Sequence, residues 1–535
     1  MSIPVFYGMA QNSGAAYQID NSIRLRASAS AYLSRTFGAG STTQWTISVW
    51  VKLGDLTKHQ TILNGGNGTQ TNGTNDAIQI YPDGGVALQR KSGVGGNWYR
   101  IFSSVIRDPS GWYHFVLRSD LGNGTVANRL MCWINGVQQN SYTDSSTVPN
   151  GTWPYLSAAV PHNIGRSDQG GGPLCSDQYL AEYCFIDANA TLTPSDFGET
   201  NTNGVWVPKA YSGTYGNNGF YLPFDDATSL TTLGYDRSGN SNNWTCNNIS
   251  LSTGVTYDHM VDTPTNNYAT LNPLDESASA GVSNANLTTT GTNAGWVVRG
   301  SVAMTSGKWY WEQTQDFGGA AGWCGIASDT ASLSSQPAFD SQQWAYYGGS
   351  GNKYNGAANS AYGVTWTNGD VIGVALDMDA GTLAFYKNGV SQGVAYSTGI
   401  VGKTFFAAVS FGSAVSYSET LNFGQRPFSY TPPTGFKALC TANLSLTAPT
   451  ASGTFTGNAS ADGPFVWIGG VPTTLTINGN AVTFGTHADK AAGGFKLRTS
   501  SSSYNAAGSN SWTATFASPS TKSAFAQPQP AQGNP

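Results

Sequence analysis

The sequence predicts an all-β protein, and three observations lead to this prediction. Charged residues make up only 10% of the chain and Gly occurs 66 times, a composition typical of sandwiches and fibres. Short alternating apolar runs are separated by Gly, Asn and Pro at the intervals of a β-sandwich. The dipeptide Asn-Gly, which tolerates the two positive φ angles of a type I′ hairpin turn, ends a predicted strand at Asn135, Asn388 and Asn478. We therefore expect two β-sandwich domains and a small β module.

Length and charge restrict the possible functions. At 535 residues the chain is too long for one core and fits two large domains plus a small one. A net charge of −5 provides no positive field that would attract nucleic acid or an anionic membrane. No signal peptide and no membrane-spanning run is recognisable. We expect a protein that is soluble as made, binds no nucleic acid and inserts into no membrane.

The first large domain is expected over residues 21–225, after an N-terminal anchoring arm at 1–20. Residues 45–51 alternate over a full strand, with Ile47, Val49 and Val51 on one face and Trp50 on the other, so both faces must be partly covered. Further strands are predicted at 61–63, 77–80, 86–88, 112–117, 131–134 and 179–186. A connecting region follows at 226–275.

The second large domain is expected over residues 276–430. Its centre is the stretch 369–389, which contains two apolar runs joined by Asp379-Ala380-Gly381 and ends in Lys387-Asn388-Gly389. This pattern predicts a hairpin followed by another reversal. Beyond it we expect a Pro-rich linker at 431–440, a small β module at 441–518 and a disordered tail at 519–535.

The first domain resembles the concanavalin A-like, laminin-G-like jelly-roll family. The resemblance covers about residues 20–200 and depends on the order of five short pieces. These are Trp45 to Lys52, Gly111 to Val116, Cys132 to Val137, Asn163 to Arg166, and Tyr179 to Glu182 with Leu192 to Pro194. It implies a jelly roll whose loops bind ligands.

The second domain resembles the SPRY domain, a bent β-sandwich that binds partners through its loops. The matching pieces are Lys308 to Glu312, Gly322 to Ala327, Gly369 to Gly389, Phe405 to Ser410 and Leu421 to Gly424. Two connecting stretches, Asp236 to Trp244 and Asp262 to Tyr268, resemble joints in tailed-bacteriophage structural proteins, as does the exit Arg426 to Phe436. This resemblance implies a virion protein.

A jelly roll of this class can be a glucanase, and that activity requires a suitably placed pair of carboxylates. Retaining glycosidases need two carboxylates about 5 Å apart, and the usual Glu-x-Asp-x-x-Glu spacing is absent from the sequence. Asp377 and Asp379 lie on one strand face and are interpreted as a turn scaffold. We expect no enzyme.

Metal and cysteine chemistry find little support in the sequence. The five histidines lack HxH or HExxH spacing, and His114 is interpreted as a packed or rim residue. We expect no cofactor; a weak Ca²⁺ candidate is Asp168, because laminin-G-like domains sometimes bind calcium with loop oxygens. The six cysteines lack a CxxC motif and most are expected free and buried, with pairing of Cys175 and Cys184 left open.

Aromatic residues in polar, turn-rich segments are the candidate ligand-binding residues. Aromatics flanked by Asn, Gln and Asp stack and hydrogen-bond with sugar or protein surfaces, although large sandwiches also close their ends with aromatics. The candidates are Trp98, Tyr99, Trp153, Tyr155, Trp344, Tyr346, Tyr347 and Tyr354.

The sequence thus predicts a non-catalytic virion protein of a tailed phage, a tail fibre, adhesin or head fibre that binds a host-surface glycan or protein. The arm would attach it to other virion proteins, and multivalency would strengthen weak binding. Phage fibres by analogy favour a homotrimer. Two alternatives remain: a capsid or tail cement protein, and a polysaccharide depolymerase whose carboxylates converge from different strands.

Overall fold

The computed structural model describes residues 17–444, with gaps at 67–73, 93–96, 104–105, 146, 170–171, 203, 292–295 and 412–415; beyond 444 it describes only the backbone of short strands. The chain divides into two compact units. The larger unit spans 11–201 and 206–443 and holds both sandwiches, and the smaller contains residues 444–535. The predicted all-β class is confirmed, since the described helices are single turns such as α1 (Leu230–Leu233).

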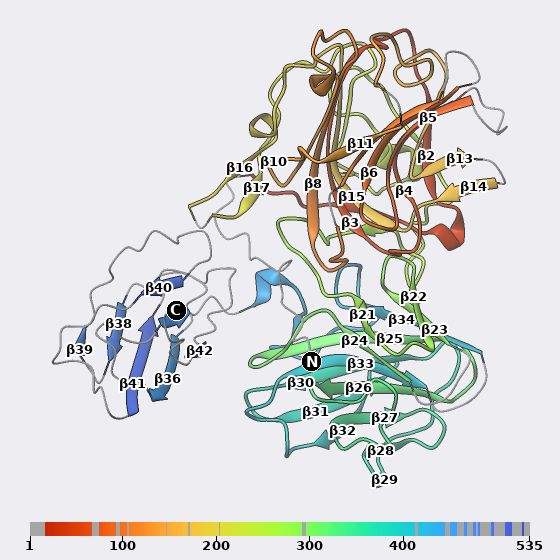
Figure 1. Cartoon of the computed structure of the whole chain (residues 1–535). Coiled ribbons are helices and arrows are strands. Elements are labelled where there is room, and N and C mark those ends of the chain that lie inside the picture. The colour runs from red at the N-terminus through yellow and green to blue at the C-terminus, as the bar shows by residue number, and fades with distance from the viewer. Residues whose placement is uncertain are drawn as a thin grey trace. The chain divides into compact units, whose positions relative to one another are not determined.

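The first sandwich has two antiparallel eight-stranded sheets that face each other (Figure 1). In spatial order, the first sheet contains β10 (Val137–Gln138), β9 (Leu130–Ile134), β8 (Trp112–Asp120), β3 (Gln44–Leu53), β15 (Gln178–Asp187), β1 (Ser22–Leu25) and β20 (His259–Met260), and β18 (Phe220–Leu222) pairs with β15. The second contains β11 (Tyr142–Asp144), β7 (Trp98–Phe102), β6 (Val86–Ser92), β5 (Thr74–Ile80), β4 (Gln60–Gly66), β12 (Pro161–Ile164), β2 (Tyr32–Thr36) and β19 (Thr245–Asn247). Two small hairpins, β13 (Arg166–Gln169) with β14 (Gly172–Cys175) and β16 (Gly198–Thr200) with β17 (Trp206–Pro208), lie beside them.

Strand β3 shows why these residues form a sandwich. Ile47, Val49 and Val51 belong to the core between the sheets, as their alternation predicts. Trp50 lies on the other face, where its ring stacks on that of His114 at 4.7 Å. Both residues are nearly fully buried, so that face is covered too. Trp206 of β17 stacks on His114 from that side. Residues 226–275 extend both sheets, with β20 pairing beside β1 and β19 beside β2.

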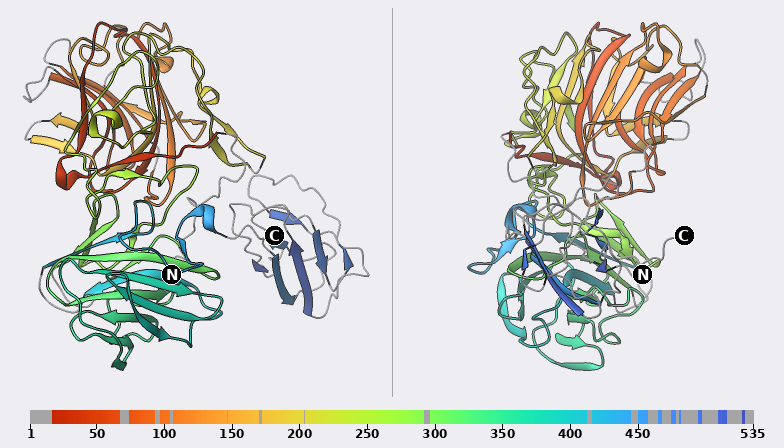
Figure 2. Two further views of the ribbon diagram at one scale, coloured as in Figure 1. Left: turned by 180° about the vertical axis from the view of Figure 1, so that it is seen from behind. Right: turned by 60° about the vertical axis from the view of Figure 1, so that its left-hand side comes forward.

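The second sandwich also has two antiparallel sheets (Figures 1 and 2). One contains, in spatial order, β21 (Leu271–Glu276), β24 (Trp296–Gly300), β33 (Phe405–Phe411), β26 (Gly322–Ser328), β27 (Gln343–Tyr347), β28 (Asn352–Asn355) and β29 (Ala358–Ala361). The other contains β22 (Ala280–Ser283), β23 (Thr288–Gly291), β34 (Tyr417–Asn422), β25 (Lys308–Phe317), β30 (Val371–Asp377), β31 (Thr382–Lys387) and β32 (Val390–Tyr396), and β35 (Lys437–Ala438) pairs parallel with β25.

The predicted hairpin forms strands β30 and β31, and the Asn-Gly turn leads into β32. Asn388 and Gly389 have φ angles of 50° and 77°, and the Asn388 side chain accepts a hydrogen bond from the Val371 amide at 2.8 Å. Asn135 and Gly136 repeat these angles in the first sandwich, whereas Asn478 lies outside the described residues. Asp377 accepts hydrogen bonds from the amides of the turn that follows it, as expected of a turn scaffold.

A buried polar cluster follows the first sandwich, around the stretch Asp262 to Tyr268. The Lys52 ammonium of β3, fully buried, donates to Asp262 at 2.7 Å, to Asn267 at 2.7 Å and to the Tyr268 carbonyl at 2.9 Å. Asp262 also accepts from the Trp112 indole at 2.9 Å. The cluster continues into the second sandwich, because Val261 donates its amide hydrogen to the Gln425 carbonyl. The stretch Asp262 to Tyr268 therefore has a structural role, because its polar groups join the two sandwiches.

The smaller unit contains two short sheets. One joins β36 (Thr450–Thr456), β41 (Ser509–Thr515), β38 (Thr474–Ile477) and β39 (Asn480–Ala481). The other joins β40 (Gly494–Lys496), β37 (Phe465–Trp467) and β42 (Gln527–Pro528), of which β42 falls within the predicted tail.

Candidate functional site

The eight aromatic candidates separate by burial. Trp98, Trp153, Trp344 and Tyr346 are at most 4% exposed and offer no contact surface, so the interpretation of these four as ligand-binding residues is corrected. Trp98 and Trp153 pack on each other at 4.7 Å in the first core. Trp344 and Tyr346 face the core of the second sandwich from β27, because the segment 343–347 is a strand rather than a loop.

Of the other four candidates, the structure brings two together. Tyr99 and Tyr155 lie in the first sandwich, where Tyr99 is 38% exposed and Tyr155 is half-buried. Tyr347 and Tyr354 are half-buried on one face of the second sandwich and share Trp323 as a neighbour. Tyr347 stacks on Trp323 at 4.3 Å, and Tyr354 contacts the same indole edge-on at 4.7 Å.

Strand alternation places these three rings on the outer face of their sheet. In β26 the side chains of Cys324 and Ile326 point into the sandwich and are buried, so Trp323 points outward. Cross-strand pairing then puts Tyr347 opposite Trp323, and Tyr354 opposite Ala345 on the next strand. The rings form a continuous aromatic cluster across β26, β27 and β28.

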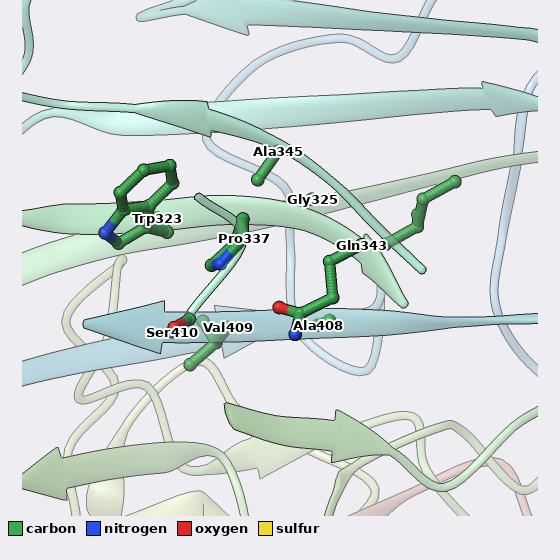
Figure 3. A pocket seen from close by; sticks show the side chains of 9 residues that line it. Trp323, Gly325, Pro337, Gln343, Ala345, Ala408, Val409 and Ser410 are labelled. Atoms are coloured by element: carbon green, nitrogen blue, oxygen red, sulfur yellow. The ribbon is translucent and has the colours of Figure 1, made fainter. Parts of the chain in front are cut away.

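A small, partly open pocket lies beside this aromatic cluster (Figure 3). Trp323, Pro337, Gln343 and Ser410 contribute side chains to its wall, with Ala345, Ala408 and Val409 making it largely apolar. Within the described residues, the Ser410 hydroxyl and the Trp323 indole N–H have no hydrogen-bond partner. The pocket therefore combines an apolar wall with two polar groups that a ligand or water can satisfy.

The loop 329–342 borders the pocket and is held firmly in place. The Asp340 carboxylate accepts from the Ser332 amide at 2.7 Å, and the Gln343 amide group donates to the Ser335 carbonyl at 2.6 Å. Gly356 of the β28–β29 hairpin donates to the Pro337 carbonyl at 2.9 Å. On this fixed loop Phe339 is 76% exposed, more than any other large hydrophobic side chain in the described residues.

We call this surface the pocket face, defined by Trp323, Pro337, Phe339, Tyr347, Tyr354 and Ser410. Trp323, Pro337 and Ser410 are buried and form its floor, so the side chains that a ligand can reach are the half-buried Tyr347 and Tyr354 and the exposed Phe339. The pocket face carries aromatic and apolar groups and no charged side chain among these six, which suits stacking against a sugar ring or an apolar side chain. The sequence indicated Tyr347 and Tyr354 but not Trp323, which matched a strand, nor Phe339. Phe339 meets the criterion that selected the other candidates, since it is an aromatic residue in a polar loop.

Glu182, a buried carboxylate of the first sandwich, has structural partners. Glu182 occupies a β-bulge of β15 with a φ of 51°, and burial raises its pKa to about 7. Its two oxygens accept hydrogen bonds from the Tyr17 and Tyr221 hydroxyls at 2.7 and 2.8 Å. Both oxygens are thus engaged by the protein itself, as in a structural bulge rather than a glycosidase pair.

His114 is a packed residue, as expected. It is fully buried, its Nε2 is 2.8 Å from the Ser48 hydroxyl, and its Nδ1 accepts from the Trp206 indole at 3.0 Å. Burial lowers the pKa of His114 to about 3, so the ring is neutral at physiological pH.

The candidate metal ligand and the cysteines form no site within the described residues. Among the described residues no group of three or more His, Cys, Asp or Glu side chains is placed to hold a metal ion. The backbone of Asp168 lies in β13, but its side chain lies outside the described residues. All six cysteines are free, so Cys175 and Cys184 do not pair. No helix in the described residues is long and apolar enough to cross a membrane.

Comparison with known families identifies both sandwiches. Residues 27–176 match the family model described as the concanavalin A-like lectin/glucanases superfamily, and residues 308–426 match the SPRY domain model. The chain therefore contains a concanavalin A-like, laminin-G-like domain followed by a SPRY domain. Domains of these two kinds are typically binding modules rather than catalysts.

The chain is similar to curated proteins over short segments. It is 33% identical over 147 residues to the E3 ubiquitin-protein ligase RKP of Arabidopsis thaliana, covering 26% of this chain and 11% of that protein. It is 30% identical over 169 residues to the Ran-binding proteins 9/10 homolog of Drosophila melanogaster, covering 30% of this chain and 17% of that protein. The chain thus spans only a small fraction of the length of these relatives.

A solved structure of the SPRY domain of human HERC1 is 24% identical and covers 28% of this chain and 96% of that chain, with a TM-score of 0.25.

Proposed function

We propose that this chain is a non-catalytic binding protein of a tailed-phage virion that recognises a host-surface glycan or protein through the pocket face of its SPRY domain. The observation that carries the proposal is the aromatic cluster of Tyr347 and Tyr354 on the buried Trp323, beside an apolar pocket. The exposed Phe339 lies on the same loop as Pro337, which lines that pocket. Rigid aromatic groups supply contact area at a low entropic cost, because they have few rotatable bonds to immobilise.

The rigidity of the pocket face supports a recognition role. Loop 329–342 is fixed by side-chain and backbone hydrogen bonds from β27 and from strands β28 and β29 with their turn. A surface that is ordered before binding loses less conformational entropy when a ligand arrives. Phe339 lies exposed on this ordered loop, so contact with a ligand would cost little conformational entropy.

The virion assignment is supported by the sequence resemblance of the joint and of the exit stretch to phage structural proteins. The relatives described above are eukaryotic proteins that are similar to this chain over 147 and 169 residues only, and nothing in them supports a phage source. Attachment through residues 1–20 to other virion proteins, and a homotrimer, belong to this proposal.

Purified full-length protein incubated with immobilised host-surface polysaccharide tests the binding role and the absence of catalysis together. We expect retention of the protein without release of new reducing ends. New reducing ends would refute the non-catalytic assignment. Binding to host-surface proteins, measured on protease-treated and untreated cells, separates the two ligand classes.

A second candidate, a cement protein that binds neighbouring subunits, is favoured by one observation. The edge strand β32 carries Val390 and Val394, which are 66% and 57% exposed, and Val364 nearby is 56% exposed. The Val364 amide donates to the Gln392 side chain of β32, which places these valines on one side of the domain. Intact particles that lose capsid or tail stability without the protein, with no loss of host binding, would support this candidate.

A further inference from the structure

The inner face of the SPRY sandwich contains a fully buried acidic side chain, Glu419 of β34. Gln315 of β25 lies opposite Glu419 on one side and Thr289 of β23 lies opposite it on the other. Gln313 is the third polar neighbour, and all four residues are 0% exposed. A polar cluster at this depth is unusual in a sandwich core and requires each hydrogen-bonding group to find a partner.

Only one oxygen of Glu419 has a hydrogen-bond partner within the described residues. Its Oε2 accepts from the Gln313 side-chain amide at 2.6 Å, whereas its Oε1 has no partner within the described residues. The Gln315 Oε1 also lacks a partner, and its Nε2 already donates to the Phe317 carbonyl at 3.0 Å. Gln315 therefore cannot turn its amide over to donate to Glu419 without losing that bond.

Gly322 shows that these two unpaired oxygens point into the same small space. A Cβ atom on Gly322 would meet Glu419 Oε1 at 2.0 Å and Gln315 Oε1 at 2.4 Å. Glu419 Oε1 and Gln315 Oε1 thus both lie directly above the Cα atom of Gly322. Two acceptor oxygens that share a small space in a dry core repel, and they attract only if one of them carries a hydrogen.

We infer that Glu419 is held as a neutral carboxylic acid that donates a hydrogen bond to Gln315, and that this group makes the folded SPRY domain sensitive to alkaline pH. The proton on Oε1 turns an acceptor–acceptor contact into a hydrogen bond and removes a charge from the core. Thr289, whose hydroxyl has no partner within the described residues, adds a further polar group beside the acid.

The charged neighbours favour the neutral form. Burial raises the pKa of Glu419 well above its usual value, and the negative charge of Asp316 on β25 raises it further. From β26, Cys324 approaches Glu419, and burial raises the pKa of this thiol, so it stays uncharged. The partners on β25 and β23, Gln313, Gln315 and Thr289, are uncharged.

The sign of the pH effect follows from proton linkage. An unfolded glutamate has a pKa of about 4.3, so above that pH the unfolded chain releases a proton that the folded chain keeps. The stabilisation is complete below the unfolded value and decreases as pH rises toward the folded value. Over this range the unfolding equilibrium constant increases about tenfold per pH unit because of this group.

The test compares wild type and Glu419→Gln as full-length proteins. The new amide can donate to Gln315 as the acid does, so the variant is expected to fold. The unfolding constant of wild type relative to the variant should rise with pH between pH 5 and 9, up to about tenfold per unit. Other buried acids such as Asp76 and Glu182 contribute equally to both proteins. Parallel pH profiles would overturn the inference.

Infrared spectroscopy provides a direct measurement that does not depend on the variant folding. Wild type labelled with ¹³C-glutamate should show the carbonyl stretching band of a protonated glutamate at pH 9. At that pH Glu182 and Glu276, whose pKa values burial raises to about 7, are ionised. Burial also raises the pKa of Glu312, and a band that persists in Glu312→Gln comes from Glu419. Absence of the band at pH 9 would show that Glu419 is charged or bound to a cation, and would overturn the inference.

Discussion

At the scale of single residues, burial determines the protonation state of two histidines in the first sandwich, His114 and His162. Burial lowers the pKa of His114 to about 3 and that of His162 to about 4. His162 stacks on Phe37 at 3.8 Å, and His114 is fixed between Ser48 and Trp206. Each imidazole is therefore neutral in the folded protein over the physiological range.

This predicts acid sensitivity of the first sandwich. Below the unfolded pKa of about 6.5 the unfolded chain binds protons that the folded chain excludes, so stability present at neutral pH is lost as pH falls. His114→Gln removes one of these two groups. In calorimetry, the decrease in melting temperature between pH 7 and pH 5 should be smaller in the variant than in wild type. An equal decrease would contradict the assignment of a neutral His114.

Sequence reasoning at this scale succeeded for residues with local partners. Asp377 was correctly interpreted as a turn scaffold, because the amides it binds follow within three residues. Glu419 gave no signal, since its partners come from three other parts of the chain. Nor could the sequence show that Trp344 and Tyr346 are buried. Residues 343–347 form a strand rather than a loop because they pair with β26, which lies about 20 residues earlier in the chain.

At the scale of elements, β3 shows how one strand serves both a core and a joint. Its apolar residues fill the sandwich, and Lys52 at its end makes three hydrogen bonds to the stretch around Asp262. Alternation alone predicted the core residues. The role of Lys52 was not predictable, because its partners lie more than 200 residues away in sequence and each alone is an ordinary polar residue.

Replacing Lys52 should therefore cost more than replacing an exposed lysine. Lys52→Met leaves Asp262 buried without its counter-charge, and breaking a buried pair typically costs about 3–5 kcal/mol of unfolding free energy. The matched control is Lys58→Met, because Lys58 is 46% exposed in its pair with Asp55 and such pairs contribute about 1 kcal/mol or less. Urea unfolding measures both, and equal effects would contradict a stabilising role of the joint.

At the scale of the whole molecule, the sequence predicted the all-β class and the order of the jelly-roll and SPRY domains. This was possible because strand alternation, Asn-Gly turns and family-specific pieces are all local patterns. The binding surface is a property of several strands at once. Tyr347 and Tyr354 join Trp323 only through the pairing of β26, β27 and β28, and Pro337 and Phe339 join them through loop 329–342.

The central claim is that the pocket face binds the host-surface ligand, and one affinity measurement tests it most directly. Binding of full-length wild type, Phe339→Ala and Phe317→Ala to host-surface polysaccharide or cells is compared by titration. Phe317 is a matched control, because it is 48% exposed on β25 of the same domain and outside the pocket face. We predict about tenfold or greater loss of affinity for Phe339→Ala and none for Phe317→Ala. Equal affinities for Phe339→Ala and wild type would contradict the claim.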